Sequence, residues 1–150
     1  DNGTEEEAVT RLSRVGFDNV LGHLKDGFET WIKAAKETDI INRITADQFS
    51  KDYYDNSKVI DVRKESEYTA EHVEDAYSKP LAYINDWVKE LNPKEHFYLH
   101  CAGGYRSMIA ASILQARGYR NFTEVEGGFN AIAQTSIPKT DFVCQSKMLS

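Results

Sequence analysis

The sequence predicts an α/β fold, in which helices cover both faces of a parallel β-sheet. The first reason is alternation, because short apolar segments such as 58–62 are separated by segments with helical periodicity such as 81–91. The second reason is that the strand segments are mostly apolar, which is typical of strands buried on both faces. The third is that Asp61 and Cys101 fall at strand ends, where parallel sheets place their sites.

The N-terminal part of the chain predicts a helix, a strand and a second helix. Residues 5–15 have helical periodicity and end at Gly16, a common stop signal. Residues 19–21 form a short apolar segment that favours a strand. Residues 28–36 place Trp31 and other apolar side chains at helical spacing.

The same helix–strand–helix order recurs later in the chain with similar residues. Residues 12–20 align with 114–122 without a gap, and 26–28 align with 127–129 after a slip of one residue. The shared order of leucine, glycine, aromatic residue, asparagine and Gly-Phe favours a repeat over chance similarity. We interpret residues 1–37 as the C-terminal remnant of an earlier non-catalytic copy of the following unit, or as an interdomain segment.

Residues 41–140 form the predicted main domain, and 141–150 form a polar C-terminal tail. Thr45 is a favourable N-cap for the first helix of this domain, and Asn92 with Pro93 ends its amphipathic helix. The predicted elements are a helix at 45–54, a strand at 58–62, helices at 65–71 and 81–91, a strand at 97–99, a helix at 106–117, a strand at 121–125 and a helix at 128–133.

A loop with the residues of a nucleophilic site follows the strand at 97–99. Cys101 comes directly after the strand, Gly103 and Gly104 allow a tight turn, and a helix begins at about Arg106. This arrangement points backbone N–H groups and the positive end of a helix dipole at one sulfur atom. Such surroundings favour the nucleophilic thiolate. The alternative is a buried structural cysteine, which would not need the pair of glycines.

The length of the loop limits the kinds of reaction that the site could support. Cys101 and Arg106 enclose four residues. Cysteine-dependent phosphatases use a loop one residue longer, which is wide enough for a phosphate. A shorter loop suits a smaller load, such as the single sulfur atom of a persulfide. A phosphatase or an arsenate reductase on the same scaffold is therefore the less favoured alternative.

These motifs resemble those of the rhodanese family of sulfurtransferases over about residues 41–138. The resemblance is carried by 59–63, 71–76, the loop from 100 to 107, 118–122 and 126–129. It implies a rhodanese-like sheet, and transfer of sulfane sulfur from thiosulfate or a low-molecular-weight persulfide to a thiol acceptor. It also implies that Cys101 carries the sulfur as a persulfide. A non-catalytic sulfur-carrier or binding module of the same fold is a further alternative.

The resemblance assigns roles to the residues around the cysteine. The persulfide-binding loop comprises Ala102, Gly103, Gly104, Tyr105, Arg106 and Ser107, and the supporting residues are Asp61 and Arg63. Asp61 either holds the base of the loop or caps the turn after it. Arg106 either steers an anionic donor or pairs with an upstream carboxylate. Many family members carry arginine in place of Ala102, so with a neutral Tyr105 at the rim we expect a preference for persulfides of small thiols over thiosulfate.

The histidines predict neither a general base nor a metal site. His100 precedes Cys101 and, by strand alternation, faces the opposite way, so we expect a buried, hydrogen-bonded side chain. The four histidines of the sequence lack the spacing of metal ligands. We therefore expect no metal and no other cofactor in this chain.

The N-terminal segment carries a second resemblance. Residues 6–22 resemble the segment that joins a metallo-β-lactamase-fold domain to a rhodanese domain in persulfide dioxygenase fusions. The resemblance implies that the chain is the C-terminal part of a longer enzyme. The N-terminal metallo-β-lactamase-fold domain of that enzyme would be its partner and would carry a metal, and none of the ligands of that metal lie in these 150 residues.

Composition argues against several classes of partner. The net charge is −6 with acidic and basic residues interleaved, so we expect no nucleic-acid or membrane-surface partner. No apolar run approaches the ~18 residues of a membrane span, and the acidic start is unlike a signal peptide. Two cysteines, Cys101 and Cys144, do not make a disulfide framework. We therefore expect a cytoplasmic protein.

Overall fold

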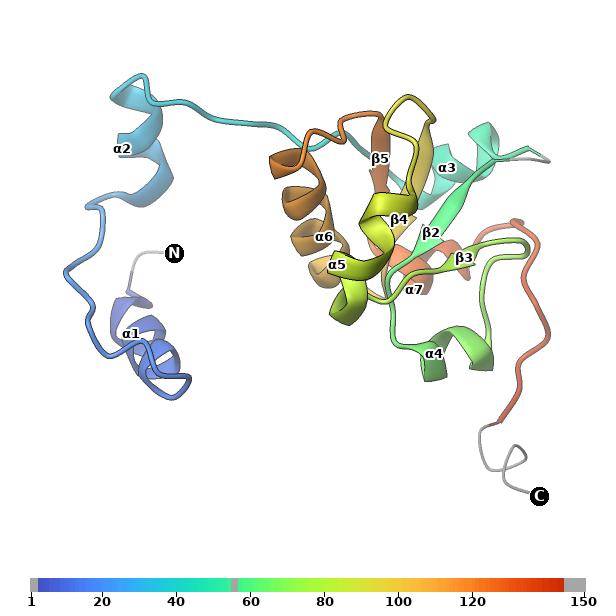
Figure 1. Cartoon of the computed structure of the whole chain (residues 1–150), viewed down its shortest axis with the longest axis horizontal. Helices are drawn as coiled ribbons and strands as arrows, with labels where there is room; N and C mark the ends of the chain where they lie inside the picture. Colours follow the sequence, from blue (N-terminus) through green and yellow to red (C-terminus); the bar gives the residue numbers. More distant parts are fainter. Residues whose placement is uncertain (1–2, 55–56, 145–150) are drawn as a thin grey trace. The chain divides into compact units, whose positions relative to one another are not determined.

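A computed structural model describes residues 3–54 and 57–144 (Figure 1). The chain divides into two compact units, residues 1–40 and 41–150, and each is described by itself. Within the described residues, no helix combines the length and the apolar composition that crossing a bilayer requires.

The second unit is built on a five-stranded sheet in which all neighbouring strands are parallel. The strand order is β1-β5-β4-β2-β3, so β4 lies at the centre and the prediction of a parallel α/β sheet is confirmed. The two edge strands are only two residues long, and the sequence analysis did not predict them. The strands are β1 (Arg43–Ile44), β2 (Val59–Asp61), β3 (Tyr77–Ser78), β4 (Phe97–His100) and β5 (Phe122–Val125).

Helices cover both faces of this sheet, as the sequence predicts (Figure 1). On one face, α5 (Ile84–Trp87) and α6 (Tyr105–Ala116) bury apolar side chains against β2 and β4. On the other face, α3 (Ala46–Asp52) and α7 (Gly128–Ile132) pack against β2 and β5. The short helix α4 (Glu65–Ala70) follows β2 and has no fully buried residue.

Several predicted elements differ from the structure in their bounds. The single helix predicted at 81–91 is a short α5 flanked by 3₁₀ turns, η1 (Leu81–Tyr83) and η2 (Val88–Glu90). Its apolar residues are nevertheless buried as a helical face requires, with Trp87 donating a hydrogen bond to the Pro80 carbonyl at 3.0 Å. The helix predicted at 106–117 begins one residue earlier, and the helix predicted at 45–54 ends at Asp52.

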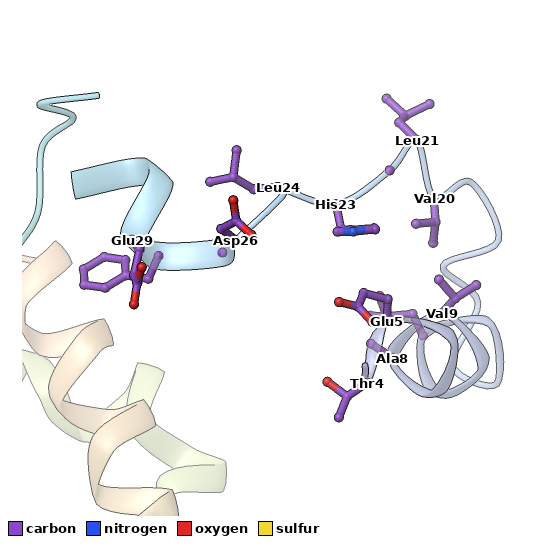
Figure 2. Close-up of a pocket in the computed structure, with 14 residues that line it drawn as sticks. Thr4, Glu5, Ala8, Val9, Val20, Leu21, His23, Leu24, Asp26 and Glu29 are labelled. Atoms are coloured by element: carbon purple, nitrogen blue, oxygen red, sulfur yellow. The ribbon is translucent and has the colours of Figure 1, made fainter. Parts of the chain in front are cut away.

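The described residues of the first unit form two helices, α1 (Glu5–Ser13) and α2 (Gly27–Lys33), and neither has a buried residue. The strand predicted at 19–21 is wrong, because residues 17–24 have no regular structure. A strand needs a neighbouring strand for its backbone hydrogen bonds, and the described residues of this unit offer none. An open groove lies between α1 and the segment before α2, with Val9, Val20 and Leu24 among its lining residues (Figure 2).

The start of α7 is hydrogen-bonded to the segment that follows β4. The Phe129 amide donates to the Cys101 carbonyl at 2.6 Å, and the Asn130 amide donates to the Ala102 carbonyl at 3.0 Å. Gly128 has a φ of +55° and sits so close that a Cβ atom would lie 2.3 Å from the Cys101 carbonyl oxygen. A glycine is therefore required where the two segments meet.

Replacing Gly128 with alanine is expected to lower the free energy of unfolding by about 3 kcal/mol, because overpacking adds to backbone strain. Gly118→Ala is the matched control: its φ is also positive, at +87°, but a Cβ there meets nothing within 4 Å. That variant should lose only about 1 kcal/mol from strain. Urea denaturation measures both values, and equal losses in the two variants would contradict the close-contact explanation.

Candidate active site

Cys101 lies at the carboxyl end of the central strand, in a ring of hydrogen-bond donors. It directly follows β4, and only 1% of its surface is exposed. The Gly104 amide donates to its Sγ atom at 3.1 Å, and Ser107 Oγ lies 3.4 Å from Sγ. The end of β4 is in register with the end of β2, so His100 lies opposite Asp61. Asp61 and Cys101, two of the predicted site residues, therefore lie at the same carboxyl end of the sheet.

The glycine pair has two different functions in the loop. Gly104 is the N-cap residue of α6. Its φ of +101° is a conformation that other residues rarely adopt. Gly103 has no such requirement, and a Cβ atom there would meet only Asn130 Nδ2 at 3.9 Å. The turn at Gly104 starts the 12-residue helix α6 beneath the sulfur, so its positive dipole end faces Sγ.

The pKa of the Cys101 thiol reflects two opposing effects. Burial raises this pKa, because a charged sulfur loses its contact with water. Hydrogen bonds from Ser107 and from the amides of Ser107, Gly104 and Gly103 lower it. The hydrogen bonds outweigh burial, and the pKa lies below the ordinary value for a cysteine. The loop therefore favours the nucleophilic thiolate.

Arg106 is held in an ion pair rather than over the sulfur. Its guanidinium donates two hydrogen bonds to the carboxylate of Glu67 in α4, at 2.6 Å and 2.8 Å. The structural pair with an upstream carboxylate, one of its two predicted roles, is thus present. The hydrogen bond from Arg106 lowers the pKa of Glu67 to about 2. This pair ties the first turn of α6 to α4.

Asp61 and Arg63 form a buried pair next to the loop. Asp61 Oδ1 accepts a hydrogen bond from the Arg63 amide at 2.9 Å, and Oδ2 accepts one from Arg63 Nε at 2.8 Å. Asp61 thus caps the turn after β2, and among the described contacts its carboxylate accepts no hydrogen bond from residues 101–107. Arg63 lies over the Phe129 ring, with 4.0 Å between its guanidinium carbon and the ring centre. Because the Phe129 amide donates to the Cys101 carbonyl, the pair packs against a residue that contacts the cysteine loop directly.

His100 faces away from the sulfur, as alternation predicts. Its Nδ1 lies 3.2 Å from the Cys101 carbonyl oxygen, and burial lowers the pKa of its ring. The side chain is thus buried and hydrogen-bonded through Nδ1, as expected, whereas Nε2 has no hydrogen-bond partner among the described residues. Oδ2 of Asp61 lies 3.9 Å from Nε2, beyond hydrogen-bond distance.

The sequence analysis missed one residue of the site, Glu124 in β5. Its side chain is fully buried, and its Oε1 accepts a hydrogen bond from Ser107 Oγ at 2.6 Å. Its Oε2 accepts one from Arg43 Nε at 2.8 Å. A charged residue in the middle of a predicted buried strand was the available signal. The rim residue Tyr105, by contrast, is 81% exposed, and Ala102 is half-buried.

Known proteins resemble the second unit. A sequence profile of the rhodanese-like domain matches residues 45–135. The uncharacterized protein YqhL of Bacillus subtilis is 29% identical over 90 residues, which cover 60% of this chain and 71% of YqhL. The putative sulfur carrier protein YrkF of the same organism is 30% identical over 70 residues, or 47% of this chain and 38% of YrkF. The uncharacterized Synechocystis protein slr1261 is 32% identical over 80 residues, and the match spans 53% of this chain and 45% of slr1261.

Solved structures share the fold. The crystal structure of a rhodanese-like domain protein from Staphylococcus aureus superimposes with a TM-score of 0.59 at 28% identity. It covers 65% of this chain and 96% of that protein. A rhodanese-related protein from Thermoplasma volcanium gives a TM-score of 0.60 at 24% identity, over 66% of this chain and 97% of that protein.

The pair between Glu67 and Arg106 predicts a pH-dependent stability. A lowered carboxyl pKa stabilises the fold above the unfolded-state value of about 4.3, and this contribution is lost as the pH falls towards about 2. After solvent screening of these partly exposed side chains, Glu67→Gln should cost about 1 kcal/mol at about pH 6 and almost nothing at about pH 2.

Urea denaturation at the two pH values measures this difference. Glu95→Gln is the matched control, because Glu95 pairs with Lys58 at 2.5 Å and is half exposed. That variant should change the free energy of unfolding by less than about 0.5 kcal/mol at either pH. A Glu67→Gln effect that is the same at both pH values would rule out the ion pair as its cause.

Proposed function

The chain is a member of the rhodanese-like domain family, and from this premise we propose that it is a sulfurtransferase that carries sulfane sulfur as a persulfide on Cys101. The observation that supports the proposal is the ring of donors around Sγ, which includes the Gly104 amide at 3.1 Å. The donor is thiosulfate or a low-molecular-weight persulfide, and the acceptor is a thiol. The reaction needs no metal or organic cofactor.

The transfer has two steps. The Cys101 thiolate attacks the outer sulfur of the donor, the sulfur–sulfur bond of the donor breaks, and sulfite or a thiolate leaves with the electron pair. The new persulfide is an anion, and the amides of the loop with the dipole of α6 stabilise it. An acceptor thiolate then attacks the outer sulfur of the persulfide, and the Cys101 thiolate is restored.

The rim of the loop supports a preference among donors. Ala102 offers no charge to a dianionic thiosulfate, and Tyr105 is an exposed aromatic side chain at the entrance. A neutral, partly apolar rim suits the persulfide of a small thiol better than a small dianion. We therefore expect glutathione persulfide to be a faster donor than thiosulfate.

A sulfur-carrier module is the second candidate function. YrkF, which has 30% identity to this chain, is described as a putative sulfur carrier. A carrier holds the same persulfide on Cys101 but hands it to one specific protein, so its turnover with small thiols is slow. A phosphatase or an arsenate reductase is less favoured, because the loop is short and Arg106 is held by Glu67 rather than turned towards an anion.

We further propose that residues 1–37 are the last part of a preceding rhodanese-like unit. The aligned repeat supports this: Leu12, Val20 and Phe28 correspond to residues 114, 122 and 129, which are buried in the second unit. In the first unit the three side chains are exposed. These three side chains have the apolar pattern of a core, but the described residues of the first unit form no sheet against which they could pack.

We also propose that this chain is the C-terminal part of a longer fusion protein. The resemblance of residues 6–22 supports a fusion with an N-terminal metallo-β-lactamase-fold domain, which would oxidise the persulfide that this domain exchanges. A reducing compartment such as the cytoplasm would keep the Cys101 thiol available.

Intact-mass measurement tests the persulfide. After brief exposure to glutathione persulfide, and separately to thiosulfate, the protein should gain the mass of one sulfur atom and lose it on addition of cyanide. Cys101→Ser should abolish the gain, whereas Cys144→Ser, which removes the exposed cysteine, should retain it. No gain with either donor, from a folded protein, would overturn the proposal.

Turnover separates the two candidate functions. A sulfurtransferase should release sulfite from thiosulfate, or release glutathione from glutathione persulfide while the sulfur passes to a second thiol, over many cycles per protein. A carrier should stop after a single sulfur atom per Cys101. A burst of one equivalent with no further release would therefore favour the carrier.

A further inference from the structure

The outer face of α6 differs from the outer faces of α3, α4 and α5. The solvent side of a helix on a protein surface normally carries charged or strongly polar residues. The exposed residues of α3 include Asp47 and Lys51, those of α4 include Glu65, and those of α5 include Asp86. All 12 residues of α6 are described, and none of its exposed residues is charged. The longest helix of the second unit therefore turns an uncharged face to the solvent.

Four residues make up this outer face, and they are Tyr105, Ile109, Ser112 and Ala116. Their spacing of three or four residues keeps them on one side of the helix. Tyr105 is 81% exposed and Ile109 is 39% exposed. The Ser112 hydroxyl donates to the Met108 carbonyl at 2.9 Å, within the helix. A partner that covers Ser112 would therefore leave its hydroxyl hydrogen-bonded, so covering this residue costs little.

The outer face begins beside the nucleophile. Tyr105 directly follows Gly104, whose amide donates to Cys101 Sγ at 3.1 Å. From Tyr105 to Ala116 the helix rises by about 16 Å. A small thiol that reaches the sulfur would contact the near end of this face and leave Ser112 and Ala116 uncovered. The length of the face therefore fits an acceptor that is much larger than the thiol group it presents.

The size and the lack of charge of this face limit the kind of partner. A face about 16 Å long and about 10 Å wide covers roughly 160 Å², whereas each partner of a stable complex buries about 800 Å². Such a face is too small to hold a second copy of the chain, but it suits the brief encounter that repeated sulfur transfer requires. A charged partner surface would lose its water here without gaining an ion pair. The matching surface is therefore apolar and uncharged.

We propose that the outer face of α6 docks the sulfur acceptor, and that this acceptor is a protein cysteine on a protruding segment with apolar, uncharged flanks. The proposal rests on the proposed sulfur transfer by Cys101. The docked acceptor thiolate attacks the outer sulfur of the Cys101 persulfide, and a new sulfur–sulfur bond forms. The bond within the Cys101 persulfide breaks, and its electron pair stays on Cys101 as the thiolate. The acceptor leaves as a persulfide, and no external oxidant or reductant is needed.

The test compares acceptors of one chemistry and different surroundings. The full chain with Cys144→Ser, which removes the exposed cysteine, is loaded from glutathione persulfide and freed of the donor. The acceptors are two short synthetic peptides with a single cysteine, flanked by leucines in one and by glutamates in the other, and the small neutral thiol 2-mercaptoethanol. Mass spectrometry follows the sulfur that each acceptor gains. The leucine peptide should react about tenfold faster than the glutamate peptide.

A lysine in the middle of the face should reverse this preference. Ile109→Lys should slow the leucine peptide about tenfold and accelerate the glutamate peptide, because the new charge pairs with glutamate. Its rate with 2-mercaptoethanol should be unchanged, since a small thiol does not need the face. Tyr54→Lys is the matched control: Tyr54 is an exposed aromatic residue in the segment before β2, and this variant should leave all three rates unchanged.

The possible outcomes separate this proposal from the proposed function. Equal rates for the two peptides, or an Ile109→Lys variant that slows all three acceptors alike, would overturn the docking face while sulfur transfer itself stands. Sedimentation velocity that finds a dimer of the chain, which Ile109→Lys dissociates, would assign the face to a second copy and also overturn the proposal. A folded chain whose Cys101 takes up no sulfur would overturn the proposed function, and the docking proposal with it.

Discussion

The sulfur of a cysteine that is 1% exposed can hold a negative charge only where hydrogen-bond donors replace the water it has lost. This constraint explains most of the local structure of the second unit. The Gly104 amide supplies one donor, and the turn at Gly104 brings the first turn of α6 beneath the sulfur. The left-handed conformation of Gly104 is thus a requirement of the charge and not only of the turn.

The carbonyl groups of the same loop need partners of their own, and α7 provides them. The amides of Phe129 and Asn130 donate hydrogen bonds to the carbonyl oxygens of Cys101 and Ala102. Gly128 makes this approach possible. The buried Asp61–Arg63 pair supports α7 in turn, because Arg63 lies against the Phe129 ring. The start of α6 and the start of α7 therefore both support the cysteine loop.

The sequence predicted the features that depend on near neighbours and missed those that depend on distant ones. Apolar runs and glycines were sufficient for β2, β4, β5, α6 and the cysteine loop. The edge strands β1 and β3 have two residues each, too few for a periodic pattern, and exist only because β5 and β2 bind them. Residues 19–21 do not form the predicted strand, because no neighbouring strand lies beside them in the described part of the first unit. Glu67 and Glu124 meet α6 through tertiary packing, so their partners in the site were not visible in the sequence.

The short edge strand β1 also connects the site to the rest of the chain. The first unit ends at Ile40, and Arg43 is the first residue of β1. The Arg43 guanidinium lies 2.8 Å from the carboxylate that faces Ser107. Only Ile41 and Asn42 separate the end of the first unit from Arg43, and Ile41 packs against the hydrophobic core of the second unit. The start of β1 is therefore joined to the cysteine loop by two hydrogen bonds, from Arg43 to Glu124 and from Ser107 to Glu124.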